Sequence, residues 1–89
     1  MTYLLLLTPQ AQKHLEEWRK SGQKKTLEKI AKLLNELTSH PKTGTGQVEQ
    51  LRGNLSGFWS RRISKADRII YSIEDEKVIV TVISMKGHY

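Results

Sequence analysis

Two arginines stand side by side in the segment NLSGFWSRRI, residues 54–63, directly after two large aromatic rings. Aromatic rings favour a protein core, whereas an unpaired guanidinium group is costly to bury there. A guanidinium is permanently charged, and its fork of N–H donors matches the oxygens of a phosphate group. The segment therefore predicts a strand that feeds a core with one face and carries cationic side chains on the other.

Alternation along a strand separates the two arginines. Arg62 shares its face with Phe58 and Ser60, while Arg61 points the other way, where we expect a salt bridge or a role at the sheet edge. In the next apolar segment Ile69, Tyr71 and Ile73 form the core set, which places Arg68 and Ile70 on the opposite side. A favourable register would then bring Arg62 and Arg68 together on one face of the sheet.

The elements that position these arginines follow from the hydrophobic pattern. Residues 3–7 form a short apolar run, which indicates a buried strand. Thr8 is a suitable cap and Pro9 a suitable first residue for a helix that ends at residues 21–22. A second helix is expected over residues 24–37, with an apolar stripe made by Leu27, Ile30, Ala31, Leu34 and Leu37.

The period then changes from helical to alternating. A loop at residues 42–47 precedes four expected strands at residues 48–51, 57–63, 68–74 and 77–86, the last two joined by a tight turn near Asp75. The order is strand-helix-helix-strand-strand-strand-strand. This order predicts an α+β domain in which two helices pack on one face of a mainly antiparallel, twisted sheet.

Composition limits the class of protein. The chain has 89 residues, expected to form one domain over 1–89, with 37% hydrophobic and 27% charged residues and no cysteine. No apolar run approaches a membrane span, so we expect no membrane partner and a cytoplasmic location. The net charge of +6 suits nucleic acid, an acidic protein partner or simple solubility, and charge alone does not decide among them.

A longer pattern resembles the YoeB/Txe family of bacterial toxins, a branch of the RelE-like ribonucleases. The pattern consists of a proline, two glycines, a Glu-x-Leu, the whole of NLSGFWSRRI, then RIIY and a closing His-Tyr. In this sequence these residues are Pro41, Gly44, Gly46, Glu49, Leu51, residues 54–63, residues 68–71, His88 and Tyr89. Asp67 is a departure, because some relatives have a basic or polar residue before the arginine.

The resemblance implies a fold like that of microbial ribonucleases and a metal-independent endoribonuclease that needs no cofactor. Such a toxin cleaves mRNA in the ribosomal A site, forms a homodimer in many cases, and is held inactive by an acidic cognate antitoxin of the YefM/Axe type. Carried over by position, Glu49 is the general base, Arg68 stabilises the phosphate and His88 is the general acid. The remaining implied contacts to phosphate and substrate are those of Arg52, Arg62 and Tyr89.

Other interpretations stay open at this point. The same scaffold would suit a non-catalytic toxin related to the gyrase poisons, or a simple RNA-binding module. Glu49 taken alone is an ordinary solvated carboxylate, and Arg68 would pair equally well with Glu49 or Asp67. Trp18 and Trp59 favour core or dimer contacts over base stacking, and His14 and His40 favour structural or solvated positions.

Overall fold

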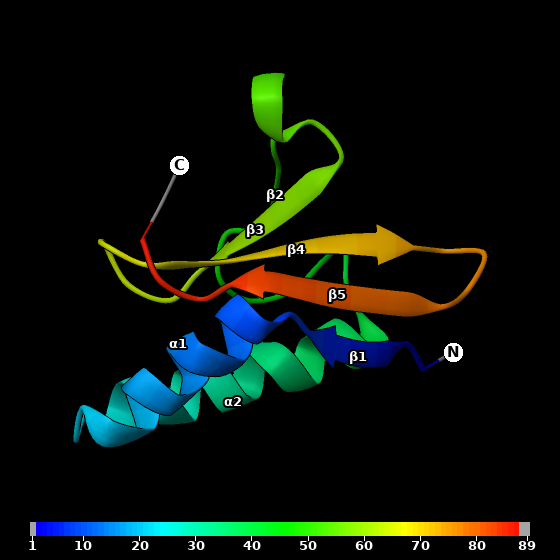
Figure 1. Ribbon diagram of the computed structural model, residues 1–89. Coiled ribbons are helices and arrows are strands. Elements are labelled where there is room, and N and C mark those ends of the chain that lie inside the picture. The colour runs from blue at the N-terminus through cyan, green and yellow to red at the C-terminus, as the bar shows by residue number, and fades with distance from the viewer. Residues whose placement is uncertain (1, 88–89) are drawn as a thin grey trace.

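The computed structural model describes residues 2–87. Over these residues the elements are β1 (Leu4–Leu7), α1 (Pro9–Lys20), α2 (Lys24–Ser39), β2 (Glu49–Gln50), the short 3-10 helix η1 (Gly53–Leu55), β3 (Phe58–Arg62), β4 (Arg68–Glu74) and β5 (Ile79–Ser84). The sheet has the strand order β1-β5-β4-β3-β2, and each neighbouring pair is antiparallel except β1 with β5. Both helices lie on one side of the sheet (Figure 1). The predicted α+β architecture is confirmed.

Helix α1 starts as its sequence predicts. The Thr8 hydroxyl accepts a hydrogen bond from the Ala11 N–H at 3.1 Å, and Pro9 occupies the first helical position. Trp18, near the other end, is buried and donates its ring N–H to the Met85 carbonyl at 2.8 Å. The core interpretation of Trp18 is therefore confirmed, and this bond ties α1 to the end of β5.

The predicted stripe of α2 was partly wrong. Ile30 and Leu37 are buried as expected, but Leu33 is the third buried residue and Ala31 is exposed. The difference arises because α2 has two apolar contacts instead of one. One row of residues faces the sheet, while Leu27 and its neighbours along the helix face the groove between the two helices.

Strand β1 is not fully buried, which corrects the expectation from its apolar run. Leu4 and Leu6 are 58% and 44% exposed, while Leu5 and Leu7 pack against the core. β1 is an edge strand that the helices cover on one face only, so its alternate residues face solvent. A run of identical residues carries no period-two signal, and sequence alone therefore did not reveal this.

Arg61 lies in the interior, and its predicted salt bridge is confirmed. Its guanidinium group is fully buried and pairs with the Glu36 carboxylate at 2.9 Å. It also donates to the Tyr71 hydroxyl at 3.3 Å, to the Thr43 carbonyl at 2.6 Å and to the His40 carbonyl. These bonds fasten the loop after α2 to the sheet, so Arg61 is a structural residue and does not lie at the sheet edge.

Candidate functional site

The face of the sheet opposite the helices carries the predicted arginines. Arg62 of β3 is paired in register with Arg68 of β4, and Ser60 is paired with both Glu49 of β2 and Ile70 of β4. Because side chains at paired positions point to the same face, Glu49, Arg62 and Arg68 gather on this uncovered side. Figure 1 shows α1 and α2 on the other side of the sheet. The register that the sequence required is present.

Glu49 and Arg68 form the centre of the cluster. The Arg68 Nη1 atom lies 3.0 Å from the Glu49 carboxylate and 3.1 Å from the Ser60 hydroxyl. The Arg68 side chain is only 18% exposed, while that of Glu49 is 58% exposed. The guanidinium is thus fixed by two acceptors, and the carboxylate remains accessible to a ligand that approaches from solvent.

Arg62 has no such acceptor among residues 2–87, and its Nε atom is buried without a hydrogen-bond partner there. Two like charges at directly opposite positions on neighbouring strands repel each other. The repulsion between Arg62 and Arg68 is offset on one side only, by Glu49. An anion placed between the two guanidinium groups would offset the rest, which makes this pair a suitable phosphate site.

The middle of this face is closed to solvent. Ser60, Ile70 and Ser84 form a row across β3, β4 and β5, and each is at most 2% exposed. Ile70 does lie on the face opposite the main core, as predicted, yet it is buried there. Ser60 was missed as a site residue, although its parity with Arg62 placed it on the correct face. Its role as an acceptor for Arg68 depends on the register, which sequence did not supply.

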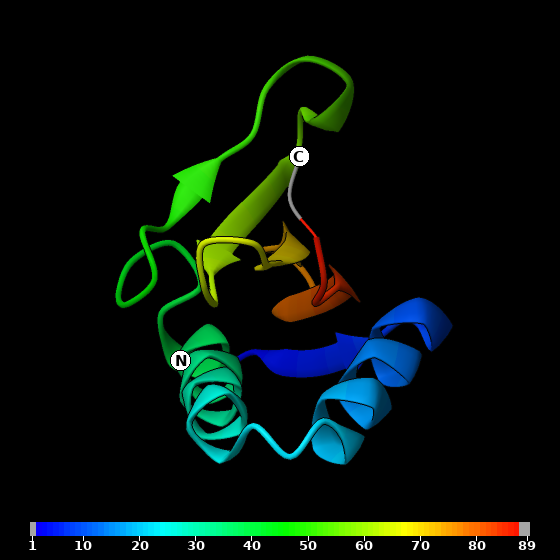
Figure 2. The same ribbon diagram turned by 90° about the vertical axis from the view of Figure 1, so that its left-hand side faces the viewer.

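The other predicted site residues are Arg52, His88 and Tyr89. Arg52 is exposed in the loop between β2 and η1, and within residues 2–87 no hydrogen bond or ion pair joins its side chain to Glu49, Arg62 or Arg68. His88 and Tyr89 lie outside the described residues. The preceding residue, Gly87, accepts a hydrogen bond from the Arg68 N–H at 2.9 Å. Figures 1 and 2 show the chain directly after β5, up to residue 87, turning toward the side opposite α1 and α2.

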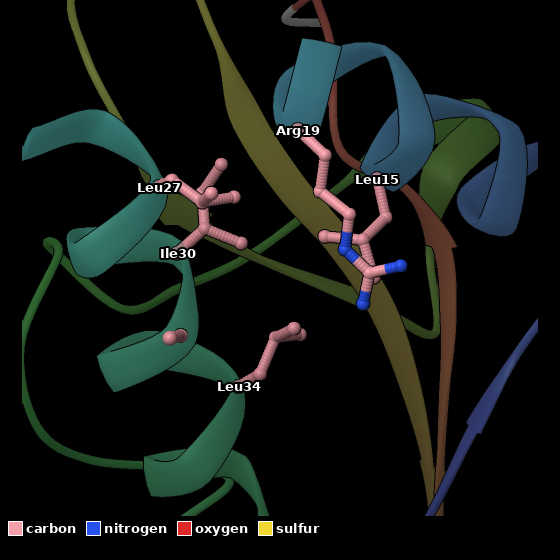
Figure 3. A pocket seen from close by; sticks show the side chains of 6 residues that line it. Leu15, Arg19, Leu27, Ile30 and Leu34 are labelled. Atoms are coloured by element: carbon pink, nitrogen blue, oxygen red, sulfur yellow. The ribbon is translucent and has the colours of Figure 1, made fainter. Parts of the chain in front are cut away.

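A groove of about 210 Å³ lies between α1 and α2. Figure 3 shows Leu15 and Arg19 of α1 on one wall and Leu27, Ile30 and Leu34 of α2 on the other. The groove is apolar except for one arginine and lies on the helical side of the sheet. It therefore offers no acid–base pair and is separate from the cluster around Glu49.

Residues 2–87 contain neither a candidate metal centre nor a membrane-spanning helix. Within this range no three side chains of histidine, cysteine, aspartate or glutamate lie close enough together to hold a metal ion. No helix over the same residues combines the length and apolar character needed to cross a membrane.

Comparisons with known proteins agree with one another. Residues 7–89 match the family model described as the YoeB-like toxin of bacterial type II toxin–antitoxin systems. A Toxin YoeB of Synechocystis sp. is 39% identical over 72 residues, which cover 81% of each chain. A solved YoeB/ParE toxin from Agrobacterium tumefaciens superposes with a TM-score of 0.89 at 30% identity, covering 97% of this chain and 99% of that one. A chain of the heterotetrameric YoeB-YefM toxin-antitoxin complex from Staphylococcus aureus superposes with a TM-score of 0.82 at 30% identity, covering 100% of this chain and 100% of that one.

Two helices on one face of a five-stranded sheet make up the fold that this chain shares with these solved toxins. The chain belongs to the YoeB-like toxin family of bacterial type II toxin–antitoxin systems. The resemblance drawn from residues 41–71 and the closing His-Tyr is thereby confirmed at the level of family and fold.

Proposed function

We propose that this toxin is a ribosome-dependent, metal-independent endoribonuclease that cleaves mRNA in the A site. The observation that carries the proposal is the accessible Glu49 carboxylate held 3.0 Å from Arg68, with Arg62 at the paired position of the next strand. A base beside two cations, one of them fixed by hydrogen bonds, is an arrangement that suits cleavage at a ribose phosphate. An RNA-binding module would need the cations but not the accessible carboxylate.

The chemistry assigns one task to each group. The 2′-hydroxyl gives its proton to Glu49 while its oxygen bonds to phosphorus, and the bond to the 5′-oxygen breaks. Arg68 and Arg62 stabilise the charge that builds on the phosphate oxygens, and His88 gives a proton to the departing 5′-oxygen. The products are a 2′,3′-cyclic phosphate and a 5′-hydroxyl, and DNA, which lacks the 2′-hydroxyl, is not a substrate. In this proposal Arg52 and Tyr89 contact the RNA around the reacting phosphate.

The proposal includes the partners expected from the sequence. A related toxin forms a complex with the antitoxin YefM, and a structure from Staphylococcus aureus is described as a YoeB dimer. We infer that this chain likewise has a cognate acidic antitoxin and forms a homodimer. The net charge of +6 favours an acidic partner that covers the face with Glu49, Arg62 and Arg68. In this proposal the target is the ribosome in the cytoplasm.

In vitro translation with purified protein tests the proposal, with the ends of the message mapped by primer extension. We expect discrete cuts inside codons on ribosomes, and a loss of about 10²–10⁴-fold in the rate of cutting for Glu49→Gln. The matched control is Glu76→Gln, because Glu76 is an exposed carboxylate in the turn after β4. A message that stays intact with the wild-type protein would refute the nuclease. If DNA replication also stalled in cells that express the protein, the gyrase-poison alternative would be favoured.

A further inference from the structure

The three residues that precede His88 are each held by other parts of the chain. The Met85 N–H donates to His14 Nδ1 at 3.0 Å, and its carbonyl accepts from Trp18 at 2.8 Å. Lys86 pairs with Glu17 at 2.8 Å. A chain end is usually poorly ordered unless it is tied down. Here the ties begin at the end of β5 and continue to the residue next to His88.

The last of these ties lies beside the cluster. The Gly87 N–H donates to Asp67 Oδ1 at 2.8 Å, and the Gly87 carbonyl accepts from the Arg68 N–H at 2.9 Å. Two consecutive residues therefore hold both polar backbone groups of Gly87. One of them is Arg68, whose guanidinium binds Glu49, so Gly87 is connected to the cluster through a single residue.

The turn between β3 and β4 fixes Asp67 itself. Its backbone carbonyl accepts hydrogen bonds from the N–H groups of Ile63 at 2.9 Å and Ser64 at 3.2 Å. The Ser64 hydroxyl also lies 3.4 Å from Asp67 Oδ2. The carboxylate thus projects from a closed turn, which makes it a rigid support for the segment it holds.

We propose that Asp67 is a positioning residue that sets where His88 acts by holding Gly87 beside Arg68. The inference rests on the proposed function, in which His88 gives the proton to the 5′-oxygen. Gly87 is the residue directly before His88 in the sequence, so the Asp67 bond fixes the chain at the position from which His88 follows. Without the Asp67 bond, Gly87 spreads over more conformations, and the rate falls to the full rate multiplied by the fraction of molecules that is still competent.

Single-turnover cleavage on programmed ribosomes tests this with three variants. Asp67→Ala removes the acceptor, and we expect a loss of roughly 10–100-fold in rate, as for a small misplacement of a catalytic group, with the concentration for half-maximal rate unchanged. Asp67→Asn keeps an acceptor oxygen and is expected to retain most of the rate. Ser64→Ala is the matched control, because it removes the two side-chain hydrogen bonds of Ser64, to Asp67 Oδ2 and from the Ala66 N–H, without touching the bond between Asp67 and Gly87.

Two further measurements separate positioning from general damage. In a His88→Ala background, Asp67→Ala should cause no additional loss, because both changes remove the same contribution. With RNA that carries a 5′-bridging sulfur, the leaving group needs no proton, and the defect of Asp67→Ala should disappear. If the alanine variant does not fold, Asp67→Leu keeps the branched shape without the acceptor and replaces it.

The outcomes distinguish the two proposals. A wild-type protein that leaves the message intact refutes the nuclease itself. A wild-type protein that cuts, with Asp67→Ala equally fast, overturns only the role of Asp67. An Asp67→Ala loss that persists unchanged in the His88→Ala background, or on the sulfur-bridged RNA, also overturns it.

Discussion

Replacing Arg61 by methionine is expected to destabilise the protein far more than the same change at Arg62, its neighbour in sequence. Arg61 is fully buried and donates hydrogen bonds to Glu36, to two loop carbonyls and to a tyrosine hydroxyl. Methionine has a similar length but no donor. Arg62 lies on the other face, partly exposed and without a side-chain partner among residues 2–87.

The expected magnitude follows from the groups left behind. Each buried acceptor without a partner costs about 1–3 kcal/mol, but the four losses do not add, because the loop at residues 40–46 can open to water. Breaking a buried ion pair from one side costs about 3–5 kcal/mol, and we take this range for Arg61→Met. The melting temperature should then fall by at least about 12 °C, since 1 kcal/mol corresponds to about 4–8 °C in a domain of this size.

Thermal and urea unfolding followed by circular dichroism measure both variants. Both variants are made in a protein that also carries Glu49→Gln, so that toxicity during expression is reduced equally for the two. Arg62→Met should stay within about 0.5 kcal/mol of its parent, while in the Glu49-containing protein it should slow cleavage. A melting temperature for Arg61→Met within about 4 °C of its parent would refute the reasoning. An equal loss in Arg62→Met would show that the two faces were assigned wrongly.

Two further predictions concern the acid stability of the loop and the approach to His88. The Thr45 N–H, at 2.8 Å, and the Arg61 guanidinium hold the pKa of Glu36 below its usual value of 4.5. The contribution of Glu36 to stability is therefore present above pH 4.5 and lost as the pH falls through the folded pKa. The free energy of unfolding in guanidinium chloride should decline less from about pH 7 to about pH 3 for Glu36→Gln than for the parent, and an equal decline would contradict this. Gly87 has a φ of +76°, and a methyl group placed on its Cα would meet no other atom within 4 Å, so Gly87→Ala should strain only the backbone, by about 1–2 kcal/mol. Cleavage should then slow and the melting temperature should fall by about 4–16 °C. Both effects should be smaller for Gly87→Asn, and a fully active Gly87→Ala would refute the strain.

Sequence predicted best where a period was clear. Alternation assigned Arg61 and Arg62 to opposite faces, and the structure confirms both that assignment and the pairing of Arg62 with Arg68. Prediction from sequence failed where the hydrophobic pattern was ambiguous. The run of leucines in β1 carries no alternation, and Leu33 competed with Leu34 for the buried stripe of α2.

The cluster itself was predicted only in part, because register and turns are tertiary properties. Glu49 and Arg68 were named from the resemblance, and alternation could not show that their side chains meet at 3.0 Å. The contributions of Ser60 and Asp67 were missed for the same reason. Both contacts join residues that are distant in sequence, eight positions apart for Ser60 with Arg68 and twenty for Asp67 with Gly87.

The loop before Glu49 links the buried pair to the open face. The Gly46 carbonyl accepts the Arg62 N–H at 2.5 Å, and a Cβ at Gly46 would lie 3.1 Å from the Arg62 carbonyl. A Cβ at Gly44 would collide with the Glu36 carboxylate and lie 3.1 Å from Arg61 Nη1. Both glycines also have positive φ, so they allow the loop to pass close to these groups. Residues 43–46 thus lie in a loop, as expected for residues 42–47, and this loop packs on the ion pair.

This packing makes the buried arginine relevant to the site. Arg61 holds the loop through its side chain, and Arg62 holds it through its backbone N–H, three residues before Glu49 enters β2. The position of the carboxylate thus depends on both arginines of NLSGFWSRRI, one from each face of the strand. Loosening the loop should displace Glu49 from Arg68 before the sheet unfolds, because β2 pairs through only two residues, Glu49 and Gln50. Trp59 and Arg61 therefore act together, since the face of β3 that packs against the core also fixes the loop that leads to Glu49.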